Sequence, residues 1–587
     1  GAAETRDICA DLVGKYRDRY LADRVFELAW THSQVLLQQI NATEADVQLY
    51  GRLAASVLYS NSVLRADSSL IIKNLRGQSS LWGYSISGDL PIVLLWIEDQ
   101  ANIMLVRQLI QAHAYWRLKG LAVDLVIFNE DHAGYRQVLH DQIMGLIAAG
   151  IKVKRMDRSG AIFVRNADQI SEEDRVIFQA VARAIIRDSR GTLAEQMDRR
   201  GRVQPKIPVL EPTRVFRSLP PIVEALPRKD LIFFNGTGGF TPDGREYVIS
   251  TGSEQVTPLP WVNVLANPNF GAIVSENGPS YTWSENAHEF RLTPWDNDPV
   301  MDSSGEAFYI RDEERGHFWS PMPGPARGAT PYVTRHGFGY TVFEHTERGI
   351  SSEAWLFVAV DVPVKFTVLK VRNRCGRPRR LSVSGYAEWV LGDLQPKTVM
   401  HVTTEIDPQS GAILANNSYN AEFGRRVAFF NVDHATRTVS ADRTEFIGRN
   451  GTLASPAAMI RSRLSGRVGA TLDPCAAMHV VFDLDDGEDR EIVFTLGAGQ
   501  DAADATALAR RFRDSAAARK ALDAVWLYWK HTLGAIQVET PDPSVNLLAN
   551  GWLLYQTIAC RLWGRSGYYQ SGGAFGFRDQ LQDTMAL

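Results

Sequence analysis

The sequence predicts a multidomain protein with an N-terminal helical and small α/β region, a large antiparallel β-sandwich and a further set of helices. Three observations give this class. Apolar residues first follow a helical spacing, then alternate between strand-like and helix-like segments, and then repeat with a period of two. A Pro-rich stretch separates the second region from the third, and helical spacing returns near residue 502.

The first two regions are predicted at residues 1–80 and 81–203. Residues 1–80 form a helical region, because apolar side chains recur three and four positions apart with few Gly or Pro. In residues 81–203 strands alternate with helices, which predicts a small parallel sheet with strands at 89–97, 121–129, 151–155 and 161–165. A final helix over 171–186 begins like a capping box, with Ser171 as N-cap and Asp174 in the usual place of Glu or Gln. Because no glycine-rich phosphate-binding motif occurs, we expect a structural module.

Residues 204–227 are predicted to be a Pro-rich linker, and residues 228–500 the β-sandwich. Many short segments of the sandwich region alternate apolar and polar residues, and helical signals are almost absent. The stretch NRCGRPRR, residues 373–380, is predicted to be a hairpin connection between two strands.

Helices are predicted again in a linker over residues 501–540 and in residues 541–587. The helix at 543–563 is apolar nearly all round, which is typical of a helix surrounded by other helices. Few residues follow it, so we expect residues 541–587 to be the truncated start of a helical domain. The sequence also begins without Met or a signal peptide, and we therefore expect a piece of a longer chain.

Composition excludes several function classes. The net charge of -4 and the pI near 6.4 give no reason to expect nucleic acid or an anionic membrane surface. No apolar run reaches the roughly 18 residues that span a bilayer. The four cysteines are far apart, which favours reduced thiols, and the histidines lack ligand spacing, so we predict no metal. A serine-hydrolase GxSxG motif is absent.

Several dense motifs carry a family resemblance. They include LWGYSISGDLPIVLL, TWSENAHEFRLTPWDNDPV and GYYQSGGAFGFRDQLQD. From about residue 80 to its end the chain resembles the family 94 glycoside hydrolases, the inverting sugar phosphorylases. It is most similar to the phosphorylase-like C-terminal part of bacterial cyclic β-1,2-glucan synthases and to the related 1,2-β-oligoglucan phosphorylases. The resemblance implies a β-sandwich, a helical linker and an (α/α)6 barrel, of which residues 541–587 would be the truncated start.

The resemblance also implies site residues. By position, Asp579 corresponds to the family carboxylate that binds the sugar on the non-reducing side of the scissile bond, with Arg578 beside it. Members that act on cellobiose carry an Arg six residues before that Asp, where this chain has Gly573, which could make room for a β-1,2 chain. The family's general acid would follow roughly a hundred residues later, beyond Leu587. We therefore expect no catalytic residue here, and sugar binding without turnover by this chain alone.

Other candidate substrate-binding residues have a structural alternative. Asp583 lies four residues after Asp579 on the same helical face and could order the loop instead. Gln570 and Tyr569 precede the RD pair and could line the pocket. The sandwich segment contributes three further candidates: Trp295, Asn297 and Asp298. This segment either reaches over a barrel mouth or is a Pro-pinned loop whose polar groups bond its own backbone.

The function expected from these observations is phosphorolysis of β-1,2-glucan within a cyclic β-1,2-glucan synthase. Inversion with phosphate requires one carboxylic acid to protonate the leaving oxygen, and phosphate itself is the nucleophile. The partners would be β-1,2-glucan or gluco-oligosaccharide, inorganic phosphate as co-substrate, and the rest of the parent synthase with its membrane domains, on the cytoplasmic side of the inner membrane. No cofactor is expected. The alternatives are a free-standing 1,2-β-oligoglucan phosphorylase and a non-catalytic carbohydrate-binding or scaffold module.

Overall fold

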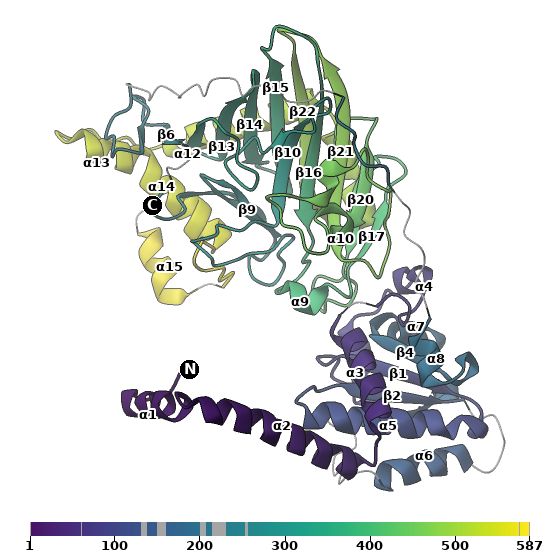
Figure 1. The fold of residues 1–587 in the computed structure, drawn as a ribbon. Coiled ribbons are helices and arrows are strands. Elements are labelled where there is room, and N and C mark those ends of the chain that lie inside the picture. Colours follow the sequence, from purple (N-terminus) through teal and green to yellow (C-terminus); the bar gives the residue numbers. More distant parts are fainter. Residues whose placement is uncertain are drawn as a thin grey trace. The chain divides into compact units, whose positions relative to one another are not determined.

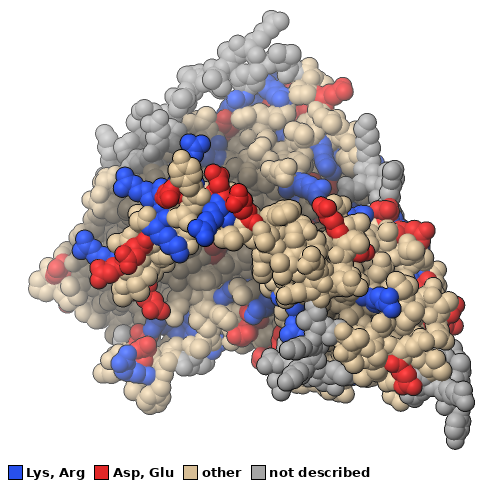
Figure 2. Space-filling view, turned by 60° about the horizontal axis from the view of Figure 1, so that its bottom comes forward, with Lys and Arg blue, Asp and Glu red and all other residues tan. Residues whose placement is uncertain are grey.

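The computed structural model describes residues 2–59, 61–130, 138–149, 160–199, 207–213, 230–252, 256–574 and 576–585. The chain divides into two compact units, Gly1–Arg202 and Val203–Leu587 (Figure 1). Among the described residues, no helix combines the length and the apolar character needed to cross a membrane. On the face shown in Figure 2, acidic and basic side chains mingle without a large area of one sign.

The first unit begins with four helices, as the periodicity predicts: α1 (Arg6–Tyr16), α2 (Arg19–Ile40), α3 (Glu44–Leu58) and α4 (Ser68–Ile72). A reciprocal capping box starts α3, in which the Thr43 side chain accepts from the Asp46 backbone N–H and the Asp46 carboxylate accepts from that of Thr43. The cap of α2 is Asn41 in the left-handed conformation, with φ of 50°.

A four-stranded parallel sheet of order β3-β2-β1-β4 forms the centre of the first unit. Its strands are β1 (Ile92–Ile97), β2 (Asp124–Asn129), β3 (Ile162–Asn166) and β4 (Ala184–Arg187). The helices that alternate with and follow these strands are α5 (Ile103–Leu118), α6 (Val138–Ala149), α7 (Glu172–Val181) and α8 (Leu193–Met197). The parallel sheet that the alternating pattern predicts is therefore present. The strand predicted at 151–155 lies outside the described residues.

The predicted helix over 171–186 is wrong in its second half. Helix α7 ends at Val181, Ala182 is extended, and Ala184–Arg187 form strand β4 beside β1. Neighbouring isoleucines suit a buried strand, and pairing with β1 stabilises that conformation over continuation of the helix. At the start of α7, Ser171 accepts from the Asp174 backbone N–H, as expected. The Asp174 carboxylate accepts from the Ser171 hydroxyl, so its shorter side chain gives a variant of the capping box.

The second unit contains the predicted antiparallel sandwich. A ten-stranded sheet has the order β17-β18-β19-β22-β15-β14-β13-β12-β6-β5, a five-stranded sheet the order β11-β10-β16-β21-β20, and a three-stranded sheet the order β7-β8-β9. Apolar side chains of all three sheets share one buried core. The strands are β5 (Gly238–Phe240), β6 (Glu246–Thr251), β7 (Val262–Asn267), β8 (Phe270–Ser275), β9 (Gly278–Ser284), β10 (Glu306–Asp312), β11 (Phe318–Trp319), β12 (Tyr332–Gly337), β13 (Tyr340–Glu347), β14 (Ile350–Val358), β15 (Val364–Asn373), β16 (Arg379–Glu388), β17 (Thr403–Ile406), β18 (Ile413–Asn416), β19 (Val427–Val432), β20 (Thr438–Asp442), β21 (Pro474–Leu484) and β22 (Asp489–Gly499). Two short α-helices, α9 (Gln395–Thr398) and α10 (Arg443–Phe446), and one 3-10 helix, η5 (Ala457–Ile460), interrupt them in the part of the chain described.

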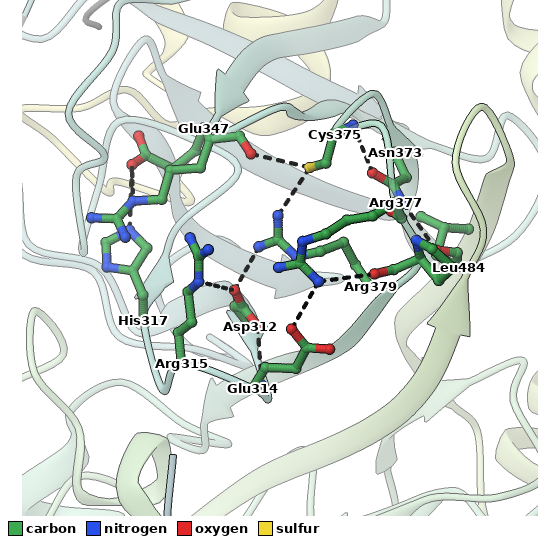
Figure 3. A network of polar contacts seen from close by, with 12 residues as sticks. Asp312, Glu314, Arg315, His317, Glu347, Asn373, Cys375, Arg377, Arg379 and Leu484 are labelled. Atoms are coloured by element: carbon green, nitrogen blue, oxygen red, sulfur yellow. Dashed lines mark hydrogen bonds and ion pairs between the residues drawn. The ribbon is translucent and has the colours of Figure 1, made fainter. Parts of the chain in front are cut away.

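The predicted hairpin at residues 373–380 is also wrong. Strand β15 pairs with β14 and β22, whereas β16 pairs with β10 and β21, so this connection passes from one sheet to the other. A polar network holds it (Figure 3), in which the Arg379 guanidinium donates to Asp312 Oδ2 over 2.5 Å and to the Cys375 thiol over 2.9 Å. Arg377 Nη1 donates to Glu314 Oε2 over 2.9 Å. Asp312 and Glu314, which are distant in sequence, thus hold the connection in place of the turn hydrogen bonds of a hairpin.

The Pro-rich linker is described only at 207–213. There Leu210 N donates to Ile460 O over 2.9 Å, and Ser462 N donates to Pro208 O over 3.1 Å. This part of the linker therefore lies along a loop of the sandwich. The rest of the predicted linker lies outside the described residues.

Helices follow the sandwich as predicted: α11 (Ala502–Arg511), α12 (Ser515–Leu533), α13 (Pro543–Leu547), η6 (Leu548–Trp552), α14 (Leu553–Gln556), η7 (Thr557–Gly564) and α15 (Phe577–Thr584). The segments from α13 to η7 follow one another without a break, and η6 and η7 are π-helical. One face of this long helix packs on the sandwich through the buried side chains of Trp552, Tyr555 and Ala559. The apolar pattern around the helix therefore reflects contact with strands as well as with α12, where the sequence led us to expect helices alone.

Candidate functional site

Two segments far apart in sequence meet beside the C-terminal helices. We call residues 285–302, between β9 and β10, the sandwich loop, and residues 565–574, after η7, the C-terminal turn. The buried Arg291 joins them, because its Nε and Nη2 donate to Ser571 Oγ over 3.2 and 2.9 Å. Ser571 Oγ in turn donates to Ala287 O over 2.6 Å, and Arg291 Nη1 donates to Asp393 O over 2.7 Å. Burial lowers the pKa of Arg291, which nevertheless keeps its charge near neutral pH.

Two of the three predicted sandwich residues bind the backbone of the C-terminal turn. Trp295 Nε1 donates to Tyr568 O over 3.0 Å, and Asn297 Nδ2 donates to Tyr569 O over 3.4 Å. The Arg291 guanidinium lies 5.1 Å from the centre of the Trp295 ring, in cation–π contact. These side chains position the turn.

Asp298 behaves differently. Its carboxylate accepts from the backbone N–H groups of Val300 and Met301, each over 3.1 Å, so it orders its own loop. Its carbonyl oxygen accepts from the Tyr568 hydroxyl over 3.0 Å. The contacts of Asp298 match the alternative in which polar groups of the loop satisfy the loop's own backbone.

The turn itself is tightly closed. Gly567 N donates to Gln570 O over 2.8 Å, and Gly573 N donates to Arg565 O over 3.0 Å. The side chains of Tyr569 and Gln570 are exposed, so both predicted residues remain open to solvent. Gly573 has φ of +64°, and a Cβ there would lie 2.2 Å from Asn286 Oδ1. An Arg at this position would thus need both backbone strain and a shift of Asn286.

Helix α15 presents the two predicted carboxylates in different surroundings. Asp579 lies in its first turn with its side chain 58% exposed, and Oδ1 is 3.3 Å from Nε of the neighbouring Arg578, itself largely exposed. Asp583 Oδ2 instead accepts from Arg561 Nε on η7 over 2.7 Å, and this bond raises the pKa of Arg561. Asp579 is therefore accessible to a ligand, whereas Asp583 ties α15 to η7.

Three contact residues were not among the predicted site residues: Tyr281, Tyr568 and Ser571. Arg291 belongs to the dense sandwich segment that the sequence singled out, together with Trp283, Glu285 and Asn286. The Tyr281 hydroxyl bonds the Ser566 hydroxyl, and burial raises the pKa of Tyr281 to about 12. Tyr568 in the C-terminal motif was a usable signal, because a buried tyrosine needs a partner for its hydroxyl. Ser571 carried no signal, since its partner Arg291 is 280 positions away.

The comparisons with known proteins agree with this architecture. The model of the glycosyl hydrolase 94 supersandwich domain matches residues 245–515, and that of the glycosyl hydrolase 94 superfamily catalytic domain matches residues 528–587. The chain belongs to glycoside hydrolase family 94. The catalytic-domain match covers only residues 528–587, so an (α/α)6 barrel beginning there stays a prediction.

Individual relatives of this family 94 chain include a synthase and phosphorylases. The cyclic beta-(1,2)-glucan synthase NdvB of Rhizobium meliloti is 34% identical over 100% of this chain and 21% of its own length. The N,N'-diacetylchitobiose phosphorylase of Vibrio furnissii is 27% identical, over 60% of this chain and 44% of its own. The solabiose phosphorylase of Paenibacillus borealis is 28% identical, over 60% and 45%. The chain thus spans about a fifth of the synthase and less than half of either phosphorylase.

Proposed function

We propose that this chain is the phosphorylase-like part of a cyclic β-1,2-glucan synthase and acts on β-1,2-glucan chains. The observation that carries the proposal is the similarity to the Rhizobium synthase along the whole chain. The two phosphorylases match about 60% of it. Similarity that extends over the entire chain favours a synthase over the alternative of a free-standing 1,2-β-oligoglucan phosphorylase.

The proposed reaction is inverting phosphorolysis. An oxygen of inorganic phosphate attacks the anomeric carbon, the glycosidic C–O bond breaks, and a general acid gives its proton to the leaving oxygen. The products are α-glucose 1-phosphate and a glucan one residue shorter, so the reaction would control chain length. The proton donor is not assigned to a residue of this chain, and no cofactor is needed because phosphate is the co-substrate.

In this proposal Asp579 binds the sugar on the non-reducing side of the bond. Its carboxylate is exposed and pairs only with an adjacent exposed Arg578 within the described residues, so sugar hydroxyls can donate to it at little cost. The sandwich loop supports the site indirectly, since Trp295 and Asn297 fix the turn that precedes α15.

The test is turnover by the full-length protein. Wild type is expected to release α-glucose 1-phosphate from β-1,2-glucan and phosphate, and Asp579→Asn should lower kcat/KM by about 10- to 100-fold, the value of one hydrogen bond to a charged group. Asp583→Asn is the matched control and should cost less, because its partner is Arg561. Normal turnover by D579N would overturn the role of Asp579. Absence of release by wild type, with product length unchanged in D579N, would instead favour a non-catalytic scaffold.

The whole protein's setting is part of the same proposal. The partners would be β-1,2-glucan or gluco-oligosaccharide, inorganic phosphate and the remainder of the synthase. We place this part on the cytoplasmic side of a bacterial inner membrane, held there by membrane domains elsewhere in the protein. Fractionation of the full-length protein, with protease protection of inside-out vesicles, checks this placement.

A further inference from the structure

A cavity of about 250 Å³ lies in the second unit, and the last residues of the sandwich loop form part of its lining. Its walls come from the end of β6, the loop before β7, the β8–β9 turn and the residues around Pro323. Small-molecule pockets usually measure roughly 300–1,000 Å³, so this one suits a single ring or the end of a chain. The polar lining residues are Thr251, Thr257, Glu276, Asn277, Asp302 and Arg327.

Two polar atoms in this lining are buried and have no hydrogen-bond partner among the described residues. They are Oγ1 of Thr251, a residue only 3% exposed, and Nε of Arg327. Arg327 is otherwise held in place, because Nη2 donates to Gly252 O over 2.7 Å. A buried polar group without a partner destabilises a protein, because it has lost its hydrogen bonds to water. Both residues line the cavity, so a small side-chain rotation on binding would let a ligand supply an acceptor to Arg327 and a partner to Thr251 and remove that cost.

The carboxylates of the lining already have partners. Glu276 accepts from the Thr257 hydroxyl and from Trp261 N over 2.7 Å. Asp302 accepts from the hydroxyls of Ser275 and Tyr568, over 2.7 and 2.9 Å. A carboxylate has about four lone-pair sites, so each can still accept from a ligand hydroxyl.

The charge balance decides the ligand class. Two carboxylates face one guanidinium, so an anion such as phosphate would meet net repulsion. A cation would be repelled by the Arg327 guanidinium, which lines the same cavity. A neutral polyol can donate to the carboxylates and accept from Arg327 and Thr251 at the same time.

The mouth of the cavity adds apolar contacts. Val256, Leu259, Val300 and Met301 are exposed at 71%, 52%, 89% and 71%, and three prolines line the wall with them. Aliphatic side chains of this kind pack against the C–H groups of a pyranose ring. We propose that this cavity is a second sugar-binding site, which holds one pyranose ring of a neutral gluco-oligosaccharide. The lining residues indicate the class of ligand, a neutral sugar, and only the choice of glucose rests on the proposed function.

This site shares a contact with the C-terminal turn. Tyr568 makes both contacts: its hydroxyl donates to Asp302, and its carbonyl oxygen accepts from Trp295 Nε1. A sugar that hydrogen-bonds Asp302 therefore acts on the same loop that positions the turn before α15.

The test is calorimetric titration of the 587-residue chain with the β-1,2-linked glucose disaccharide, in an Asp579→Asn background that weakens the first site. D579N should still bind. Adding Thr251→Val should weaken binding by about three- to tenfold, the value of one hydrogen bond. Adding Met301→Trp should abolish it by filling the mouth, whereas Met104→Trp, at an exposed methionine of the first unit, should not.

The outcomes separate this site from the proposed function. Loss of all binding in D579N, or unchanged binding in both D579N/T251V and D579N/M301W, would overturn the second site. Inorganic phosphate that competes with the disaccharide in D579N would also overturn it, because the site would then be an anion site. Normal phosphorolysis by full-length D579N would contradict the role of Asp579 and leave the second site standing. Equal melting temperatures of the variants exclude misfolding as the cause.

Discussion

Replacing Ser571 by Ala tests whether one buried hydroxyl holds the C-terminal turn against the sandwich loop. In the wild type that hydroxyl accepts from Arg291 Nε and Nη2 and donates to Ala287 O. Alanine removes all three bonds and changes little else in volume. The Arg291 guanidinium stays buried and keeps its bond to Asp393 O at 2.7 Å.

The expected cost follows from these contacts. A net hydrogen bond to a charged group contributes about 1.5–3 kcal/mol, and a buried donor left without a partner costs a similar amount. Because Arg291 retains one strong acceptor, we expect S571A to favour opening of the turn by about 2–3 kcal/mol. This free energy corresponds to a roughly 30- to 150-fold larger population of the open turn.

Hydrogen exchange measures that opening directly. The amides of Gly567 and Gly573 are bonded within the turn, to Gln570 O and Arg565 O, and should exchange faster by that factor in S571A. Amides of α12 provide an internal reference, and Ser189→Ala, at an exposed serine of the first unit, is the matched control. Turn amides that exchange at the wild-type rate in S571A would show that Arg291 does not hold the turn.

Two further predictions concern buried charges. Glu306→Gln should lower the free energy of unfolding, measured in urea, by about 3–5 kcal/mol, because Lys365, buried and 2.8 Å away, keeps its charge. As the control, Asp489→Asn breaks an exposed pair with Lys370 and should lower it by less than about 1 kcal/mol. In the first unit, burial lowers the pKa of His113 to about 4 and raises that of Asp124 to about 6. Their effects largely cancel between pH 4 and 6, since unfolding protonates the histidine and deprotonates the aspartate. In Asp124→Asn only the histidine effect remains. Between pH 6.5 and pH 5 the free energy of unfolding of this variant should therefore fall by about 1–2 kcal/mol more than that of the wild type. Urea titrations at the two pH values measure this difference.

The large features of the fold were predictable because they depend on periodicity. The alternation of strands and helices gave the parallel sheet, and the period of two gave the antiparallel sandwich. The two errors in the fold have a common cause. Ala184–Arg187 became a strand because β1 lies beside it, and residues 373–380 became a crossover because Asp312 and Glu314 bind its arginines. Such partners are far away in sequence and leave no local pattern.

The site was predictable in its segments but not in its contacts. Dense aromatic and polar motifs pointed to the sandwich loop and the C-terminal turn, and the structure brings Trp295 and Asn297 onto that turn. The same density did not reveal that these side chains bind backbone carbonyl oxygens. A serine paired with an arginine 280 positions earlier has no sequence signature. The sugar-binding roles of Asp579, Arg578, Tyr569 and Gln570 stay predictions.

The C-terminal turn and helix α15, which together position Asp579, are held by contacts of different strength. Buried, directional hydrogen bonds hold the C-terminal turn. Helix α15 buries none of its residues, and it is tied to η7 by the Arg561–Asp583 pair, whose side chains are 49% and 27% exposed. A pair so exposed contributes only about 0–1 kcal/mol. If a sugar that bonds Asp579 restricts the motion of α15, the entropy lost reduces the affinity that the carboxylate provides.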